Sequence, residues 1–538
     1  MMAVKQVTLS SDGQARPNPR RQPSAAIPDK NLEQVKNMNK VKSHKASWSA
    51  GASLAPASAL ALALLLSGCA AGPDFKQPEA PAVKGYTKEP FAASTSSAPT
   101  AGGAAQQFVD GMDIPAQWWT LFNSPALNAV IEQALKANPD LQSAQAALRA
   151  AQEQVSVQEG AFLPSVNASL APTRQKQPLS AGQGPSPFNL HTAQVSVSYT
   201  LDAFGGNRRQ VEGLQAQAEQ QKFLLEAAYL TLTSNVVAAA VQEAALRAQI
   251  AATQEVLKIQ SELLALLQRQ YQLGDVAQAD VLVQQAALAQ TQASLPPLQK
   301  SLALQRDLLT VLAGRFPSEE LEQKFDLASL SLPQQLPVSL PSSLVQQRPD
   351  IRSAEAQLHA ASAAVGVATA NMLPQITLSA NIGSAAARMG DLFTSGTGLW
   401  SLVGGLTQPL FAGGALLHKK RASEALLEQA AAQYQSTVIH AFQNVADSLR
   451  ALQYDADALQ AQYLAERAAA RSLEISRKSV QLGAATPQTL LTAQQTYLQA
   501  VIALAQAQAA RFADTAALFQ ALGGGWWNRG ETLAATAK

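Results

Sequence analysis

The 27 residues NPDLQSAQAALRAAQEQVSVQEGAFLP, at positions 138–164, return as RPDIRSAEAQLHAASAAVGVATANMLP at positions 348–374. Twelve of the 27 positions are identical without a gap, including a Pro-Asp pair near the start and the terminal Leu-Pro pair. This self-similarity predicts a tandem duplication. Each copy continues in the same order, with a short helix, an alternating hairpin, a very long helix, a Leu-Gly turn and a returning helix.

After each Leu-Pro pair the apolar spacing changes from the helical period to strict alternation, which is typical of strands. The alternating apolar residues are Val195, Val197, Tyr199 and Leu201 in the first copy and Ile376, Leu378, Ala380 and Ile382 in the second. About ten residues with one apolar face match a transmembrane β-barrel strand, although a periplasmic sandwich is the alternative. Four strands do not close a barrel and open edges are excluded from lipid, so the barrel must be shared between chains.

Helices of unusual length follow each hairpin. Residues 207–273 contain no Pro, so a continuous helix there would reach on the order of 100 Å. Its expected coiled-coil seam is Leu246, Ile250, Thr253, Leu257, Gln260, Leu264, Leu267 and Tyr271. In the returning helix, Pro296 and Pro297 are expected to cause a break or a kink, and Arg511 interrupts the heptads of the second half.

The predicted fold is mainly α with a β part. The long helices pair as coiled-coil arms, and the two hairpins are a four-strand share of a transmembrane β-barrel; that the helices form a periplasmic α-barrel is implied only by the family resemblance given below. The first repeat is expected at 116–314, with a hairpin at about 164–204 and helices at 206–273 and 275–314. The second is expected at 346–527, with a hairpin at about 374–411 and helices at 414–482 and 486–522. Linkers at 69–115 and 315–345 and a flexible tail at 528–538 complete the chain.

The N-terminal part has the order of a secretory signal peptide. A basic cluster ending at Lys45 precedes an apolar run at 52–66, which leads into Leu-Ser-Gly-Cys at 66–69. These residues resemble the lipobox of bacterial lipoproteins and predict a signal peptide at 38–68 and a diacylglyceryl and N-acyl lipid on Cys69. A transmembrane helix is the poorer alternative, because the run is short and contains Pro56; a buried free Cys is another.

Two further expectations concern the ends of this leader. Ala70 follows the Cys, where an Asp would retain such a lipoprotein in the inner membrane, so we expect delivery to the outer membrane. Residues 1–37 form a dispensable extension, with Met38 as an alternative start.

Composition excludes several classes of function. Residues 1–45 carry nine Lys and Arg against three acids, so the rest of the chain contributes −4 to the total charge of +2. No basic, aromatic-rich surface for nucleic acid is left. Enzyme motifs are absent and the five His residues are scattered. We therefore expect no enzyme, no metal site and no cofactor apart from the lipid.

Six short motifs identify a family resemblance. They are Gly72-Pro73-Asp74-Phe75, Trp118-Trp119, Asn138-Pro139-Asp140-Leu141, Asp202-Ala203-Phe204-Gly205, Arg348-Pro349-Asp350-Ile351-Arg352 and Leu522-Gly523-Gly524-Gly525-Trp526. Together they resemble TolC-like outer-membrane factors of tripartite efflux pumps, in the NodT-type lipoprotein branch. The resemblance covers nearly all of residues 69–527.

The resemblance implies a homotrimer with a twelve-stranded barrel. It places the protein in the cell outer membrane, lipid-anchored and in contact with outer-membrane lipid, with a large periplasmic part. It also implies contact with a periplasmic adaptor, or membrane fusion protein, and through it with an inner-membrane transporter, most simply of the RND type. The matching adaptor-contact turns are Leu273, Gly274, Leu482 and Gly483.

A periplasmic gate is implied just behind these turns. Asp280 stands at such an acidic position in the first half. The second half has Thr489 and Thr492 where many relatives carry Asp, so cation block is expected to be weak.

The implied function is an exit duct that exports small molecules, such as drugs or toxic compounds, from the periplasm or cytoplasm. The exit duct of a type I protein secretion system and a non-conducting structural envelope lipoprotein are the alternatives. The amphipathic hairpins argue against the structural lipoprotein.

Replacing Cys69 by Ser should abolish lipidation while still allowing trimers to form, because the shared barrel anchors the protein independently. Incorporation of labelled palmitate into the wild type and the Cys69→Ser variant measures this. Label that remains in the variant would show that Cys69 is not the acylated residue.

Overall fold

A computed structural model describes residues 70–176 and 187–530. Cys69, the signal peptide and residues 531–538 lie outside the described residues. The first repeat contains α2 (Pro125–Ala137), α3 (Pro139–Glu159), β2 (Ser165–Lys176), β3 (Pro187–Leu201), α4 (Gly206–Leu273) and α5 (Gln278–Leu312). The second contains α6 (Pro341–Gln347), α7 (Pro349–Ala370), β5 (Gln375–Ala386), β6 (Gly398–Thr407), α8 (Ala415–Gln481) and α9 (Pro487–Ala521).

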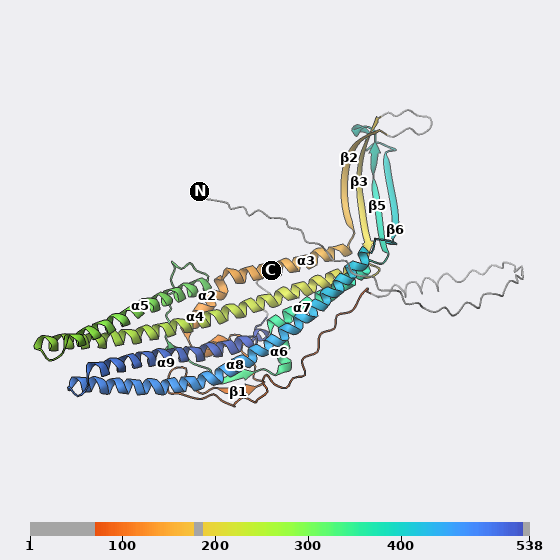
Figure 1. The fold of residues 1–538 in the computed structure, drawn as a ribbon. Helices are drawn as coiled ribbons and strands as arrows, with labels where there is room; N and C mark the ends of the chain where they lie inside the picture. The colour runs from red at the N-terminus through yellow and green to blue at the C-terminus, as the bar shows by residue number, and fades with distance from the viewer. Residues whose placement is uncertain (1–69, 177–186, 531–538) are drawn as a thin grey trace, which may run out of the picture. The chain divides into compact units, whose positions relative to one another are not determined.

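The two hairpins form one antiparallel sheet with strand order β2-β3-β5-β6 (Figure 1). The central pair, β3 and β5, joins the two repeats, with Val195 opposite Ile382 and Val197 opposite Ala380. Among the described residues, the outer strands β2 and β6 each pair on one side only. The sheet is therefore open at both edges.

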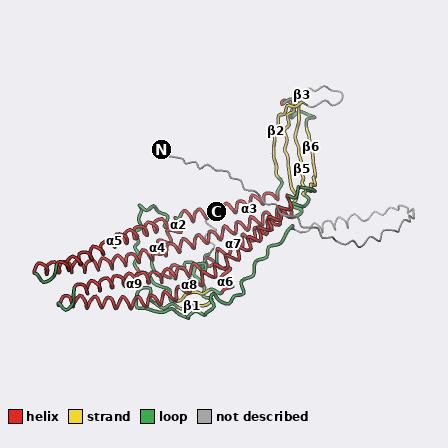
Figure 2. Tube along the Cα trace, viewed as in Figure 1, coloured by secondary structure: helices red, strands yellow, loops and turns green. Residues whose placement is uncertain are grey.

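The helices form two long antiparallel pairs, α4 with α5 and α8 with α9, and the shorter α7 packs on both α4 and α8 (Figure 2). α4 has 68 residues and α8 has 67, which at about 1.5 Å per residue gives each a length on the order of 100 Å. α4 contains an apolar window long enough to cross a membrane, but 56% of that window is buried inside the structure. It is thus a packed helix within this chain.

The buried seam of α4 differs from the predicted one at every second position. Its members are Leu246, Gln249, Thr253, Val256, Gln260, Leu263 and Leu267. The prediction of Ile250, Leu257 and Leu264 was wrong by one residue each, and Tyr271 is exposed. Both sets obey a three-and-four spacing, so only the packing partners decide between them. Of the break or kink expected at Pro296 and Pro297, the break is absent, since α5 continues through both residues; the kink stays a prediction.

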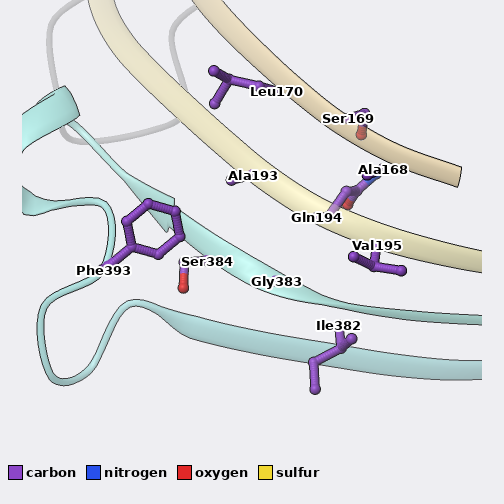
Figure 3. Close-up of a pocket in the computed structure, with 10 residues that line it drawn as sticks. All are labelled: Ala168, Ser169, Leu170, Ala193, Gln194, Val195, Ile382, Gly383, Ser384 and Phe393. Carbon is purple, nitrogen blue, oxygen red and sulfur yellow. The ribbon is translucent and has the colours of Figure 1, made fainter.

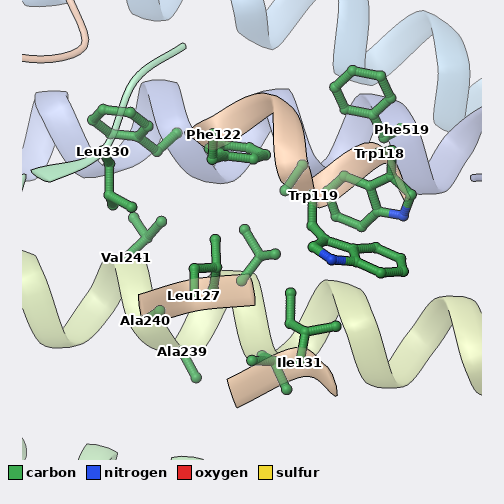
Figure 4. Packing of buried hydrophobic residues seen from close by; sticks show 14 of the residues in the cluster. Trp118, Trp119, Phe122, Leu127, Ile131, Ala239, Ala240, Val241, Leu330 and Phe519 are labelled. Carbon is green, nitrogen blue, oxygen red and sulfur yellow. The ribbon is translucent and has the colours of Figure 1, made fainter. Parts of the chain in front are cut away.

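The largest core lies where the two repeats meet, beside the short 3₁₀ helix η1 (Trp118–Phe122). Trp118, Trp119 and Phe122 are buried between α4 and α9 (Figure 4). The ring of Trp118 stacks on Phe519, with centroids 5.4 Å apart. Aromatic side chains bury large areas, so this segment fastens the two long helices together.

The predicted linkers are wrong as plain connections, because residues within both form a second sheet. β1 (Gln107–Asp110) pairs in parallel with β4 (Gln335–Val338). Four-residue strands leave too short a pattern to be read from sequence. The flexible tail is also wrong at its start, because Arg529 pairs with Glu226 and lies 3.7 Å from the ring centroid of Tyr229.

Arg511, which interrupts the heptads, is fully buried and holds the segment before β1. Its guanidinium donates to the carbonyls of Leu452 (2.8 Å) and Ala104 (3.2 Å). One turn further along α9, burial together with the Asp455 carboxyl raises the pKa of Asp514 to about 8. Asp514 therefore keeps its proton at a pH where a solvent-exposed Asp has lost it.

This proton makes stability depend on pH. The folded protein keeps it up to about pH 8, whereas an unfolded Asp loses it near pH 4, so stability falls as the pH rises through that window. Asp514→Asn should flatten the dependence, measured as denaturant midpoints at about pH 5 and pH 8. Asp447→Asn, at an exposed site on α8, is the control and should keep the wild-type slope. An unchanged slope in Asp514→Asn would contradict the raised pKa of Asp514.

Candidate functional site

One face of the four-stranded sheet is apolar across all four strands. Residues directly opposite one another share a face, and the register places Val195, Ile382 and Trp400 in one row. The next row contains Val166, Val197, Ala380 and Leu402. Trp400 is 79% exposed and Leu402 is 74% exposed. An exposed apolar surface of this extent requires a hydrocarbon or protein neighbour.

The opposite face of the same sheet is polar. Ser196, Asn381 and Ser401 lie opposite one another there, and the Asn381 amide donates to the Ser401 hydroxyl at 3.2 Å. A sheet with an apolar face, a polar face and two open edges has the properties of a barrel segment that separates lipid from a water-filled interior.

An open pocket at one end of the sheet belongs to the apolar surface. Its lining includes Leu170 from β2, Val195 from β3 and Phe393 from the β5–β6 connection, which lies beside Ser384 (Figure 3). The lining contains no ionisable side chain. It therefore lacks the convergent charged groups of a catalytic site.

The two helical turns are built alike. α4 ends at Gly274 with φ +83°, and α8 is followed by Gly483 with φ +70°. The residue after each glycine donates its amide back to the preceding helix. The Asp275 amide bonds to the Gln270 carbonyl (2.9 Å), and the Ala484 amide bonds to the Ser479 carbonyl (2.8 Å). This geometry reverses the chain and satisfies carbonyls at the helix end.

Each turn contains a leucine whose side chain is exposed to solvent. Leu273 is 70% exposed and Leu482 is 84% exposed. Behind them, Ile259, Leu263 and Leu267 of α4 pack with Leu473 of α8 and with Leu490 and Ala493 of α9. Arg477 of α8 also pairs with Glu262 of α4 at 2.9 Å. The two arms are thus held together just behind the exposed tips.

The three predicted gate residues lie at the starts of the returning helices. The Asp280 carboxylate is exposed and accepts the Ala277 amide at 3.3 Å. The Thr492 hydroxyl donates to the Gln488 carbonyl (3.0 Å), and the Thr489 amide donates to the Thr486 hydroxyl (3.4 Å). Among the described residues, no hydrogen bond joins Asp280 to either threonine within one chain.

A sequence model described as "Outer membrane efflux protein" matches residues 130–315 and 340–524, which correspond to the two repeats. The chain belongs to the outer membrane efflux protein family. Family membership confirms the resemblance and the predicted class of fold and function. The protein is an outer-membrane efflux channel component.

Related proteins align with most of the length of this outer membrane efflux protein. A probable efflux pump outer membrane protein, TtgC of Pseudomonas putida KT2440, is 31% identical over 87% of this chain and 95% of its own. The pyoverdine export outer membrane protein OpmQ of Pseudomonas aeruginosa PAO1 is 32% identical over 79% of this chain and 90% of its own.

Solved structures agree with this relationship. The outer-membrane channel OprN is 27% identical, with a TM-score of 0.76, and the match covers 85% of this chain and all of that one. The CmeC channel of Campylobacter jejuni, at 22% identity and a TM-score of 0.78 over 87% of this chain and 98% of its own, shows the same fold.

Sequence patterns did not reveal how the described N-terminal residues are placed. Ala71 bonds to the β3–α4 connection, and Arg209 of α4 is buried against Ala71 and Asp74. The Gly-Pro-Asp-Phe motif at 72–75 was the only hint, and it indicated a family without indicating a contact.

Alanine at either turn glycine should destabilise the protein, because a side chain at positive φ costs about 1–2 kcal/mol. A Cβ at Gly274 or Gly483 meets no atom within 4 Å, so the cost arises from the backbone alone. Gly160→Ala is the matched control, since Gly160 also lies in open space but has φ −57°. Denaturant unfolding should separate the turn variants from this control; equal midpoints would contradict the assignment.

Proposed function

We propose that three copies of the chain form an outer-membrane exit duct with a twelve-stranded barrel. The observation that carries the proposal is the open sheet, with unpaired edges at β2 and β6 and one apolar face. Pairing β6 of one copy with β2 of the next satisfies both edges, and closure of the ring leaves no unpaired strand in lipid. The long helices continue the tube on the periplasmic side.

The partners proposed for this duct are a periplasmic adaptor and, through it, an inner-membrane transporter of the RND type. The contact positions are Leu273, Gly274, Leu482 and Gly483. Support comes from the equivalent geometry of the two turns and from the exposure of both leucines. Two similar tips in each chain would offer an adaptor six similar contact points around a trimer.

The proposed cargo is small molecules. Relatives bear names that refer to antibiotic efflux, toluene efflux and pyoverdine export. A wide tube with a polar interior has no tight pocket for one cargo, so the partner transporter would determine what enters. The protein would act as a conduit without catalysing a reaction. A protein-secretion transporter encoded beside its gene would favour proteins as the cargo instead.

A lipid on Cys69 is proposed as a second anchor. Cys69 is the only cysteine and directly follows the Leu-Ser-Gly sequence. Acyl chains bind bilayers by about 0.8 kcal/mol per buried CH₂ group. The barrel would hold the protein in the membrane as well, so the lipid would serve sorting and assembly.

The resting duct is proposed to narrow at Asp280, Thr489 and Thr492. Three Asp280 carboxylates around a trimer axis would bind cations and repel one another, whereas threonines add no charge. Asp280→Asn should therefore weaken block by divalent cations and raise conductance, measured in planar bilayers with the purified protein. Asp326→Asn, at an exposed loop carboxylate, is the charge-matched control and should behave as the wild type.

The same recording tests the channel itself. A structural envelope lipoprotein gives no current in any form. Silence of both the wild type and Asp280→Asn would therefore contradict the duct. Equal conductance in the two forms would retain the duct and remove Asp280 from the gate.

A further inference from the structure

Residues 70–75 lie in a cradle formed by α4 and α7. The Ala71 amide donates to the Phe204 carbonyl at 3.0 Å, and Phe204 belongs to the short connection between β3 and α4. Ala70 is adjacent to the same connection, since a Cβ placed on Gly205 would lie 3.0 Å from its Cα atom. The first described residues are therefore fixed at the boundary between sheet and helices.

Two glycines allow the segment to approach α7. Gly72 has φ +90°, and a Cβ on it would lie 2.4 Å from the Cα atom of Gly366 in α7. A Cβ on Gly366 would lie 2.8 Å from the Ala71 carbonyl oxygen. Backbones at this separation leave no room for a methyl group on either side.

Arg209 of α4 joins the segment to the helices by charge. Its side chain is only 5% exposed and donates through Nε to the Ala71 carbonyl at 3.2 Å. Its two Nη groups bond to Asp74 (2.5 Å) and Glu212 (2.7 Å). A buried guanidinium requires such partners, so displacing the segment would leave this cation without two of them.

Phe75 closes the cradle over α7. Its ring stacks on His359 with centroids 4.3 Å apart and an interplanar angle of 15°. The His359 Nε2 atom lies 2.9 Å from Glu212, which also bonds Arg209. Backbone, charge and ring contacts thus hold the same six residues.

We infer that this cradle positions the lipid anchor, with Arg209 and Gly366 as its positioning residues; the inference rests on the proposed acylation of Cys69. Cys69 is bonded to Ala70, and adjacent Cα atoms are about 3.8 Å apart. Without the cradle, residues 70–85, up to the Tyr86 hydroxyl that donates to the Ser339 carbonyl, would be a tether that reaches on the order of 50 Å. Docking confines the acyl chains to the base of β3, where the apolar face of the sheet begins.

The consequence is coupled insertion of lipid and hairpins. An acyl chain held beside β3 brings the strand ends to the bilayer before the barrel closes, which lowers the entropic cost of placing four strands there. The same acyl chains on a free tether would anchor the protein without bringing the strand ends to the bilayer.

A double-mutant comparison in cells tests this coupling. The readout is the rate at which newly made protein becomes heat-resistant trimer in the outer membrane, with Cys69 intact or replaced by Ser. Gly366→Ala and Arg209→Gln should each slow assembly about fivefold when Cys69 is present. Neither should slow it further in Cys69→Ser, because no lipid is left to position.

Matched controls separate positioning from folding. Gly213→Ala changes another helical glycine, whose Cβ would be in ordinary contact with the Ala363 Cβ at 3.5 Å and the Ala360 carbonyl oxygen at 3.9 Å. Arg208→Gln changes the neighbouring arginine, which is half exposed. Both should assemble at the wild-type rate. The same slowing by Gly366→Ala in both Cys69 backgrounds would overturn the inference and make the cradle a stabilising contact only.

Two further readouts distinguish failure of docking from failure of acylation. Spin labels on Lys76→Cys and Gln357→Cys, introduced into purified Cys69→Ser protein, should give a narrow distance distribution that broadens with Gly366→Ala. A broad distribution without Gly366→Ala would refute docking itself. Absence of labelled palmitate from wild-type protein would refute the acylation, and with it the positioning role, while leaving the docking result intact.

Discussion

Inside a bilayer no water is available to bond the backbone, so each strand edge must find another strand. This constraint governs the protein, because a chain with four strands contributes two open edges. The strand register places all the alternating apolar residues on one face, so that this face of the sheet can lie against lipid. A single chain with this sheet is an incomplete object, and the proposed ring is the arrangement that completes it without exposing the polar face to lipid.

The long helices pack under a different constraint, because the faces through which they contact one another are only partly apolar. The α4 seam contains Gln and Thr among its Leu and Val residues, and Gln284 of α5 donates to the Gln260 carbonyl at 3.1 Å. Such a seam gives up some apolar burial, while its polar groups favour one alignment of the helices. The strong aromatic core near Trp118 lies far from the turns in sequence, so the tips depend on the smaller cluster around Leu267.

Three arginines, two of them buried and one partly buried, attach the segments outside the two repeats. Arg511 binds carbonyls before β1, Arg306 binds the Leu321 and Gln323 carbonyls after α5, and Arg209 binds Ala71. A guanidinium presents several donors in a fixed plane, which suits irregular backbone that lacks partners of its own. In each of these three places, an arginine side chain holds a non-repeat segment against the helices.

Sequence alone determined the duplication, the order of elements and the class of fold, because these follow from local periodicity and from glycines that end helices. Alternation along β3 and β5 sufficed to predict one apolar face, and the Leu-Gly pairs sufficed to locate both turns. The tertiary structure decided which of two equally spaced seams in α4 is buried, and it alone paired β1 with β4 and docked residues 70–75 on Gly366. The last two features join residues more than two hundred positions apart, and a period within one segment contains no information about the partner on which it packs.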